Sequence, residues 1–288
     1  MREEDNEINF ALLVFGNLGK SAELSLESIW QINPQRVCVA ADNSGMDWIN
    51  NHTPAANRSS LCFHSVPIEV LNTLGISLSE FTFYQEFGKE SFVKLTAFKW
   101  FLLHDALSKH GSQLQIIFSD LDVLWLKSPN PNIFSADLYS QCFAVIQEDT
   151  FPTELKHYFC TGIMYWQNSI ESLIVLDLIF KGQLNNITSG KMLNDEKTFN
   201  EWLITSPYQE NFKPLSKSSF VIGHRFFRFL SSRNKTFRNV VAFHANYVVG
   251  ESAKFRRLNT VALRQNNDWK WVLNLSLEIF KKFKSKIT

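Results

Sequence analysis

The sequence predicts an α/β fold with a mainly parallel central sheet flanked by helices. Short apolar runs with strand character alternate with longer segments of helical periodicity along most of the chain. This alternation is typical of sheets whose parallel strands are connected by helices. We find no internal repeat and no low-complexity linker, so we expect one domain over residues 8–265 and a C-terminal amphipathic helix over 266–288.

The first half of the expected fold begins with a strand at Phe10–Phe15, an uninterrupted apolar run. A helix is expected over Lys20–Gln31, where apolar residues recur at helical spacing, and a second strand over Val37–Ala41. Residues 46–66 are polar and rich in Asn and Ser, so they are expected to form a loop.

Ser91–His110 is the clearest helix of the sequence. Its apolar residues form one face, and Gly111 is a stop signal directly after it. The later strands are expected at Ile116–Phe118, Cys142–Gln147, Thr161–Trp166 and Val240–His244. The later helices are expected at Ser169–Phe180 and Glu196–Leu203.

Composition excludes several classes of function. Lys and Arg number 29 against 28 Asp and Glu, so no global charge indicates nucleic acid or a membrane as the main partner. The four cysteines show no C-x-x-C pairing, which argues against a zinc knuckle. Cys38 and Cys142 lie in apolar runs and are expected to be buried thiols. No stretch approaches the ~18 apolar residues that a membrane-spanning helix needs.

The most informative stretch contains Asp120 and Asp122, which follow an apolar run directly. Side chains two positions apart in an extended chain point the same way, so both carboxylates can reach one ligand. Two adjacent buried carboxylates are costly unless a cation neutralises them. The pair therefore predicts a site for a hard divalent metal, although a turn or helix-cap pair is the simpler alternative.

His244 is the second candidate ligand, because it ends an expected strand and is followed by Gly250 and Lys254. Imidazole suits Mn²⁺ as a third protein ligand beside carboxylates. Gly250 would allow close backbone approach, and Lys254 could place an ammonium group on phosphate oxygens. The alternative is a structural histidine at the end of a strand.

A second chemistry uses a similar string of residues. Haloacid-dehalogenase-type phosphatases also place D-x-D at the end of an apolar strand, with the first Asp as nucleophile. Here the bulky Trp125 follows, and the motif lies far from the start of the chain. Both departures argue against this chemistry.

Five segments, in order, resemble the nucleotide-diphospho-sugar transferase family, in particular the retaining GT-A-fold xylosyltransferases, arabinosyltransferases and galactosyltransferases of glycosyltransferase family 77. They are Phe92–Lys99, Ser119–Pro129, Cys160–Tyr165, Asn194–Asn200, and His244–Asn246 with Gly250 and Lys254. The resemblance spans about residues 8–260. It implies a GT-A fold and transfer of a sugar from a nucleotide-sugar donor, with UDP expected, to a hydroxyl group of a glycan or protein.

The resemblance also implies roles for individual residues. Asp120, Asp122 and His244 would hold Mn²⁺ or Mg²⁺, and Asp195 and Lys254 would be catalytic. The expected donor-binding residues are Asn17, Lys94, Asp120, Thr161, Gly162, Asn246 and Gly250. Asn17 is included by position alone. Lys94 and Lys99 diverge on their helix, so at most one is expected to reach phosphate, and Lys94 is preferred over Lys99. Both could instead be solvated helix lysines.

Two residues depart from the family pattern. Cys160 stands where Asn is usual, and Glu196 stands where Gln is usual. Because a thiol is a poor substitute for an amide in binding a sugar, a module that binds without turnover is an alternative to the enzyme.

The cellular compartment stays open. Relatives commonly act in the Golgi lumen behind an N-terminal anchor, so the chain acts either in the cytosol or with an anchor outside this stretch. The basic amphipathic segment 266–288 could lie on an anionic membrane, but a helix docked on the domain is favoured.

Overall fold

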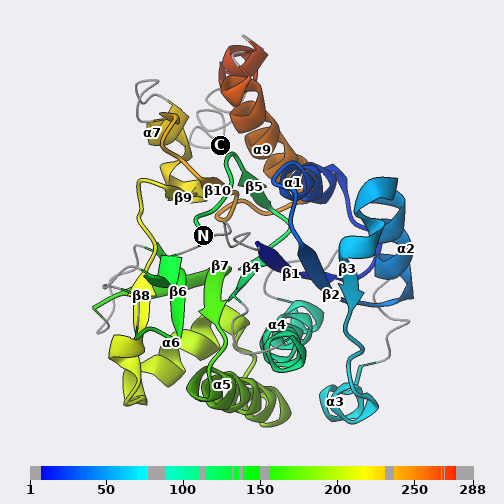
Figure 1. The fold of residues 1–288 in the computed structure, drawn as a ribbon, viewed down its shortest axis with the longest axis vertical. Coiled ribbons are helices and arrows are strands. Elements are labelled where there is room, and N and C mark those ends of the chain that lie inside the picture. Colours follow the sequence, from blue (N-terminus) through cyan, green and yellow to red (C-terminus); the bar gives the residue numbers. More distant parts are fainter. Residues whose placement is uncertain are drawn as a thin grey trace, which may run out of the picture.

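The computed structural model describes residues 8–76, 89–110, 115–131, 133–135, 139, 141–149, 156–230, 237–266, 268 and 270–276. A seven-stranded sheet with the order β3-β2-β1-β4-β7-β6-β8 forms its centre (Figure 1). The strands are β1 (Asn9–Val14), β2 (Arg36–Ala41), β3 (Leu61–Phe63), β4 (Gln115–Ser119), β6 (Ala144–Asp149), β7 (Tyr158–Gln167) and β8 (Phe212–Pro214).

The central sheet is mainly parallel, which confirms the expected fold class. Strands β3, β2, β1 and β4 pair in parallel, and β6 pairs in parallel with β8. Strand β7 is antiparallel to both of its neighbours, β4 and β6. The other six strands therefore run in one direction, and the start of β7 meets the carboxyl end of β4.

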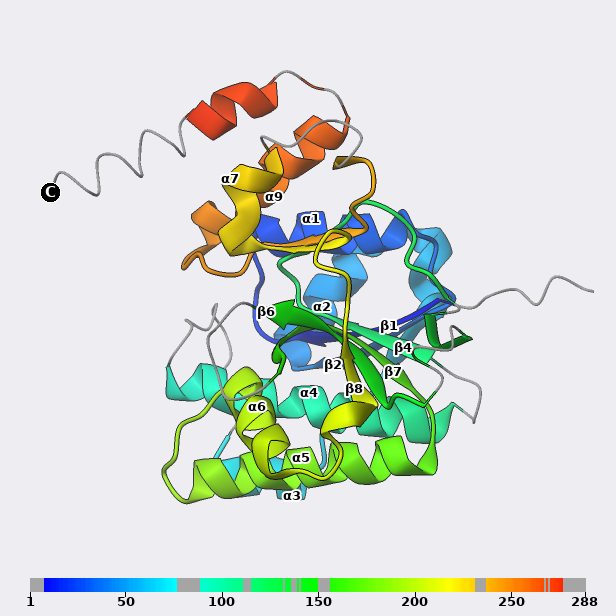
Figure 2. The ribbon, with the colours of Figure 1, turned by 90° about the vertical axis from the view of Figure 1, so that its left-hand side faces the viewer.

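Helices cover both faces of this sheet (Figure 2). One side carries α4 (Glu90–Lys109), α5 (Ile170–Thr188) and α6 (Asp195–Thr205), with α3 (Ile68–Leu74) at its edge. The other side carries α1 (Lys20–Trp30) and α2 (Asn43–His52). Three-layer packing of this kind buries both faces of the strands.

A small second sheet lies on the same side of the central sheet as α1 (Figure 2). It has the order β5-β10-β9 and consists of β5 (Val123–Trp125), β10 (Ala242–His244) and β9 (Phe220–Ile222). Helices α7 (Phe226–Leu230) and α9 (Glu251–Gln265) flank it (Figure 1). Phe226, Phe243 and Leu258 are fully buried in the core between these elements.

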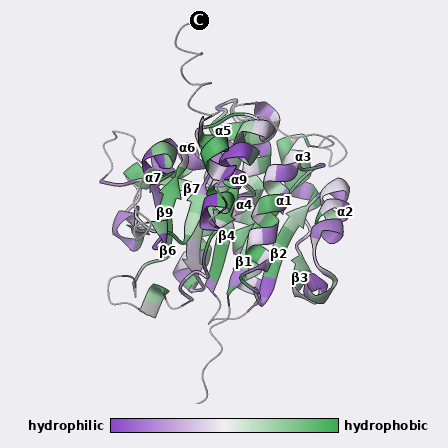
Figure 3. Cartoon of the chain, turned by 90° about the horizontal axis from the view of Figure 1, so that it is seen from above, coloured by the Kyte–Doolittle hydropathy of each residue, from purple (hydrophilic) through white to green (hydrophobic). Residues whose placement is uncertain are grey.

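The apolar face predicted for the long helix packs against the sheet. Phe98, Leu103 and Ala106 of α4 are fully buried, and burial stabilises each large apolar side chain by about 1.5–3 kcal/mol. In Figure 3 the strands are mostly hydrophobic, whereas the helices carry both colours. This distribution is what amphipathic helices on a buried sheet require.

One expectation about local structure needs correction. Residues 46–66 are not one loop, because most of α2 and the strand β3 fall within them. Asp42 caps α2 by accepting a hydrogen bond from Gly45 N at 2.7 Å. In the expected C-terminal helix, residues 270–276 are helical. Residues 277–288 lie outside the described part of the chain.

Candidate active site

The turn after β4 delivers the two aspartates. Asp120 follows β4 directly, and its backbone N–H donates to Gly162 O of β7 at 2.9 Å. Val123 N donates back to Asp120 O at 3.2 Å, which closes the turn before β5 begins. Asp120 and Asp122 are thus held at the carboxyl end of a buried parallel strand, where open α/β sheets bind their ligands.

Pairing in the small sheet brings His244 to the same place. Strand β10 is antiparallel to β5, with His244 opposite Val123. Ala245 N donates to Asp122 O at 2.8 Å, immediately beyond this pair. His244 Nε2 consequently lies 3.1 Å from Asp122 Oδ1 and 4.0 Å from Asp120 Oδ2.

The other ring nitrogen of His244 determines what Nε2 can do. Nδ1 lies 2.8 Å from Gln147 Oε1 of β6. An amide oxygen only accepts, so Nδ1 carries the hydrogen and Nε2 of the neutral ring presents its lone pair to the carboxylates. A lone pair facing two carboxylates needs a cation or a proton between them.

These three side chains therefore fit a divalent metal ion. One potential ligand atom from each of Asp120, Asp122 and His244 lies within 4.8 Å of the others. Two carboxylates and one imidazole with its second nitrogen anchored are a suitable donor set for Mn²⁺. The acidic pair predicted from the sequence and the distant histidine thus converge.

Lys254 and Gly250 approach the same carboxylates from α9. Lys254 Nζ lies 2.7 Å from Asp122 Oδ2. Gly250 caps the helix with φ of 91°, a left-handed value that favours glycine. Burial raises the pKa of Asp122, but the charges of Lys254 and His244 outweigh it and hold the pKa well below its usual range.

Of the two lysines weighed on α4, the structure brings Lys99 to this site. Its side chain is 2% exposed, with Nζ 2.5 Å from Asp195 Oδ2 and 3.3 Å from Asp120 Oδ1. Burial lowers the pKa of Lys99, but these carboxylates outweigh it and raise the pKa above its ordinary value. Lys94, the residue preferred from the sequence, forms an i,i+4 pair with Glu90 at 2.7 Å.

A signal for Lys99 was present in the sequence. It lies four residues after Leu95 and four before Leu103, in the middle of the apolar face of the helix. A lysine in that position is buried when the face packs, and a buried lysine needs anionic partners.

Asp195 and Thr161 form the next layer of the site. Thr161 Oγ1 donates to Asp195 Oδ2 at 2.5 Å, and Lys99 Nζ donates to Thr161 O at 3.0 Å. Asp195 is buried at the first position of α6. The chain therefore fixes this carboxylate from two sides.

Gly162 is required by the position of His244. A Cβ atom at residue 162 would lie 2.1 Å from His244 Cε1. Any other residue would push the ring away from the aspartates.

The two residues that depart from the family pattern also lie here. Cys160 Sγ is 3.6 Å from His244 Nδ1, and Asn246 Nδ2 lies 3.6 Å from the same sulfur. Asn246 Oδ1 accepts from Gly223 N at 2.6 Å, so Asn246 links two segments around the site. Burial, Asp195 and Asp149 together raise the pKa of Glu196 to about 7.

Sequence reasoning missed Gln147, Asp149 and Tyr247. Tyr247 has φ of 64°, and its hydroxyl donates to Asp149 Oδ2 at 2.5 Å. These residues lie on segments whose pairing has no local signal. Asn17, which was expected to bind the donor because it follows the first strand, is exposed just beyond β1. Strand β1 is the neighbour of β4 in the sheet.

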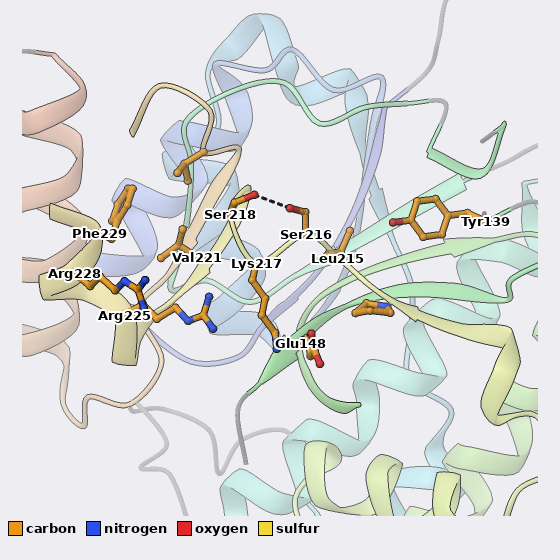
Figure 4. Close-up of a pocket in the computed structure, with 12 residues that line it drawn as sticks. Tyr139, Glu148, Leu215, Ser216, Lys217, Ser218, Val221, Arg225, Arg228 and Phe229 are labelled. Atoms are coloured by element: carbon orange, nitrogen blue, oxygen red, sulfur yellow. Dashed lines mark hydrogen bonds and ion pairs between the residues drawn. The ribbon is translucent and has the colours of Figure 1, made fainter. Parts of the chain in front are cut away.

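A separate pocket of about 630 Å³ opens between β8, β9 and α7 (Figure 4). Arg225, Arg228 and Lys217 line it, and Lys217 Nζ pairs with Glu148 Oε2 at 2.8 Å. None of the candidate metal ligands lines this pocket.

A family model decides what kind of protein carries this site. The model of the nucleotide-diphospho-sugar transferases matches residues 34–258. The chain belongs to this family. Members of the nucleotide-diphospho-sugar transferase family are glycosyltransferases. Membership therefore argues against the phosphatase alternative. A search of curated proteins gave no match.

Solved structures of glycosyltransferases share the fold of this family member. The galactosyltransferase LgtC, in complex with donor and acceptor sugar analogs, has a TM-score of 0.57 at 10% identity, covering 83% of this chain and 87% of that one. Mouse xyloside xylosyltransferase 1 has a TM-score of 0.53 at 13% identity, covering 84% and 98%. The fold is therefore GT-A.

A glycosyltransferase involved in glycosylation of the major capsid of PBCV-1 is similar as well. Its TM-score is 0.50 at 12% identity, covering 89% of this chain and 99% of that one.

Within the described residues, no helix is long and apolar enough to span a membrane.

Proposed function

We propose that the protein is a Mn²⁺- or Mg²⁺-dependent glycosyltransferase that moves a sugar from a nucleotide-diphospho-sugar to a hydroxyl group of a glycan or protein. UDP is the expected nucleotide. The observation that carries the proposal is the convergence of Asp120, Asp122 and His244 at the carboxyl end of β4. Retention at the anomeric carbon is expected from the family resemblance.

The charged residues would have separate roles in this proposal. Asp120, Asp122 and His244 would hold the metal ion, which when bound supplies positive charge to the departing diphosphate. Lys254 lies against Asp122 and would bind phosphate oxygens with its ammonium group. Gly250, directly before α9, would let the backbone approach the same phosphates.

The transferred sugar would lie on the other side of the aspartates. Lys99 and Thr161 both contact Oδ2 of Asp195, so Oδ1 is the oxygen that would accept a sugar hydroxyl. Thr161 and Gly162 form the wall of the site at the start of β7. Asn246 and Asn17 are the proposed further donor contacts, and Lys94 remains a more distant candidate for phosphate.

Retention would follow a front-face route, in which the acceptor attacks from the side of the departing diphosphate. Double displacement needs a carboxylate poised as nucleophile. Asp195, the carboxylate proposed to contact the sugar, is already bound to Lys99 and Thr161. Both contacts stabilise its charge and lower its nucleophilicity.

A sugar- or nucleotide-binding module without turnover is the second candidate. Cys160 supports it, because a thiol occupies the position of the usual amide and lies against His244 Nδ1. Such a module would keep metal-dependent nucleotide binding and would release no sugar.

Calorimetric titration of UDP, with and without Mn²⁺, tests the proposal on wild-type protein and Asp122→Ala. Binding that needs both Mn²⁺ and Asp122 is the expected result. Absence of binding by UDP and by other nucleoside diphosphates, with Mn²⁺ present, would overturn the proposal. A panel of nucleotide sugars with mass-spectrometric product detection then separates the enzyme from the binding module.

A further inference from the structure

A second cluster of metal-binding side chains lies at the far end of α4. Cys38 comes from the middle of β2, His64 directly follows β3, and His110 ends α4. One potential ligand atom from each of the three lies within 4.8 Å of the others. His110 comes eleven positions after Lys99 on the same helix, about 16 Å along its axis, so the cluster is separate from the aspartates.

His64 presents a lone pair to this cluster. Its Nδ1 lies 2.7 Å from Asp105 Oδ2, and because a carboxylate accepts, Nδ1 carries the hydrogen. His64 is 4% exposed, and its Nε2 finds no hydrogen-bond partner among the described residues. A buried polar atom left without a partner costs about 1–3 kcal/mol.

His110 has the same unmet requirement, because its Nε2 is also buried without a partner in the described part of the chain. The two rings are edge-to-face, with centroids 5.9 Å apart. Cys38 is fully buried, and its sulfur lies within 4.8 Å of a nitrogen atom of each ring.

We propose that Cys38, His64 and His110 bind a zinc ion, with water as the fourth ligand. One thiolate and two imidazoles are a donor set typical of zinc, whereas manganese prefers carboxylate oxygens. Tetrahedral zinc bonds of about 2.0–2.3 Å place neighbouring ligand atoms roughly 3.4–3.6 Å apart. Side-chain rotations that move the ligand atoms by about 1 Å would therefore complete the site.

The surroundings support the assignment. The Asp105 carboxylate holding His64 Nδ1 provides the outer contact that orients zinc-binding histidines. On binding, the thiol proton of Cys38 leaves to solvent and the sulfur donates its electron pair to the metal, without redox change. The ion would tie β2, the end of β3 and the end of α4 together.

Cobalt titration of the full chain carrying Asp122→Asn tests the proposal, because this variant weakens the other metal site. We expect one cobalt ion to bind with a thiolate-to-cobalt charge-transfer band, which zinc abolishes. The band is expected to vanish in Cys38→Ala and to persist in Cys142→Ala, which removes another buried thiol. A band that persists in Cys38→Ala, or cobalt binding without a band, would overturn the proposal.

A second measurement tests the proposal if Cys38→Ala fails to fold. His110 is partly exposed, so His110→Asn is the milder change. Zinc is expected to raise the thermal midpoint of the Asp122→Asn protein and to leave that of the Asp122→Asn/His110→Asn protein unchanged. An equal rise in both, or none in either, would refute the zinc site.

Discussion

The middle and the end of α4 meet their charge requirements in opposite ways. Midway along the helix, Lys99 lies between Asp120 and Asp195, and on the far side of the aspartates Lys254 pairs with Asp122. At its last turn, His64 and His110 present nitrogen atoms that find no partner in the described residues. The middle balances anions with the protein's own cations, whereas the end leaves nitrogen lone pairs without a donor.

This difference predicts different consequences of metal binding. At the aspartates, a metal ion competes with lysines that already stabilise the carboxylates, so the protein can fold without it. At the histidines, no described side chain donates a hydrogen bond to the two Nε2 atoms, and a metal ion would bind their lone pairs. Metal at the first site should therefore change ligand binding, and metal at the second should change stability.

The largest expected effect follows from Asp122→Asn. Loss of this ligand should weaken Mn²⁺-dependent UDP binding on the order of 10³-fold, because a metal ion contributes several kcal/mol and each 1.4 kcal/mol is tenfold. Calorimetry measures it, with Asp177→Asn as the control, since Asp177 pairs with Lys181 on the surface of α5. An unchanged UDP affinity in Asp122→Asn would show that Asp122 is not a metal ligand.

Lys99→Met tests the paired charges directly. It leaves Asp120 and Asp195 without their shared cation, and breaking a buried pair costs about 3–5 kcal/mol of unfolding free energy. Lys94→Met is the matched control, because its i,i+4 pair with exposed Glu90 contributes about 0.5 kcal/mol or less. Urea unfolding compares the two, and equal losses would show that Lys99 is not a structural cation.

The sequence predicted one of these two regions and not the other. The acidic pair was visible because apolar residues surround Asp120 and Asp122 in one short segment. The alternation of strands and helices likewise predicted the sheet, because each signal is local. His244 joined the aspartates as a ligand only through the family resemblance and its place at a strand end.

The remaining features depend on pairing between distant segments. Gln147 reaches His244 because β6 and β10 approach in three dimensions, 97 residues apart in the chain. Cys38, His64 and His110 come from two strands and a helix end, with no common spacing. The absence of C-x-x-C argued against a zinc knuckle, but it does not exclude a site assembled from separate elements.

Glu196→Gln tests the acidic side chains near Lys99 and the aspartates. The pKa of Glu196 is raised to about 7 from 4.5, so the folded state holds a proton that the unfolded state has lost between these values. Stability should therefore fall as pH rises from 4.5 to 7, by about 3 kcal/mol in total. Glu196→Gln should remove this fall.

Urea unfolding at pH 5 and pH 8 measures the difference between the two proteins. Glu201→Gln is the control, because Glu201 lies exposed on the same helix and pairs with Lys191. It should keep the wild-type dependence on pH. The same dependence in wild type and Glu196→Gln would show that Glu196 titrates normally.

Asp105→Asn gives the smallest expected effect and concerns the histidines at the end of α4. An amide can still accept from His64 Nδ1, but without charge it makes the imidazole a weaker ligand. Loss of such an outer carboxylate lowers metal affinity about 10–100-fold. Asp105 also pairs with Lys109 at 2.6 Å, so Lys109→Met is the control that removes this pair and spares the histidine. Competition with a zinc indicator measures both affinities in the Asp122→Asn background. An unchanged zinc affinity in Asp105→Asn would show that this carboxylate does not support His64 as a ligand at this end of α4.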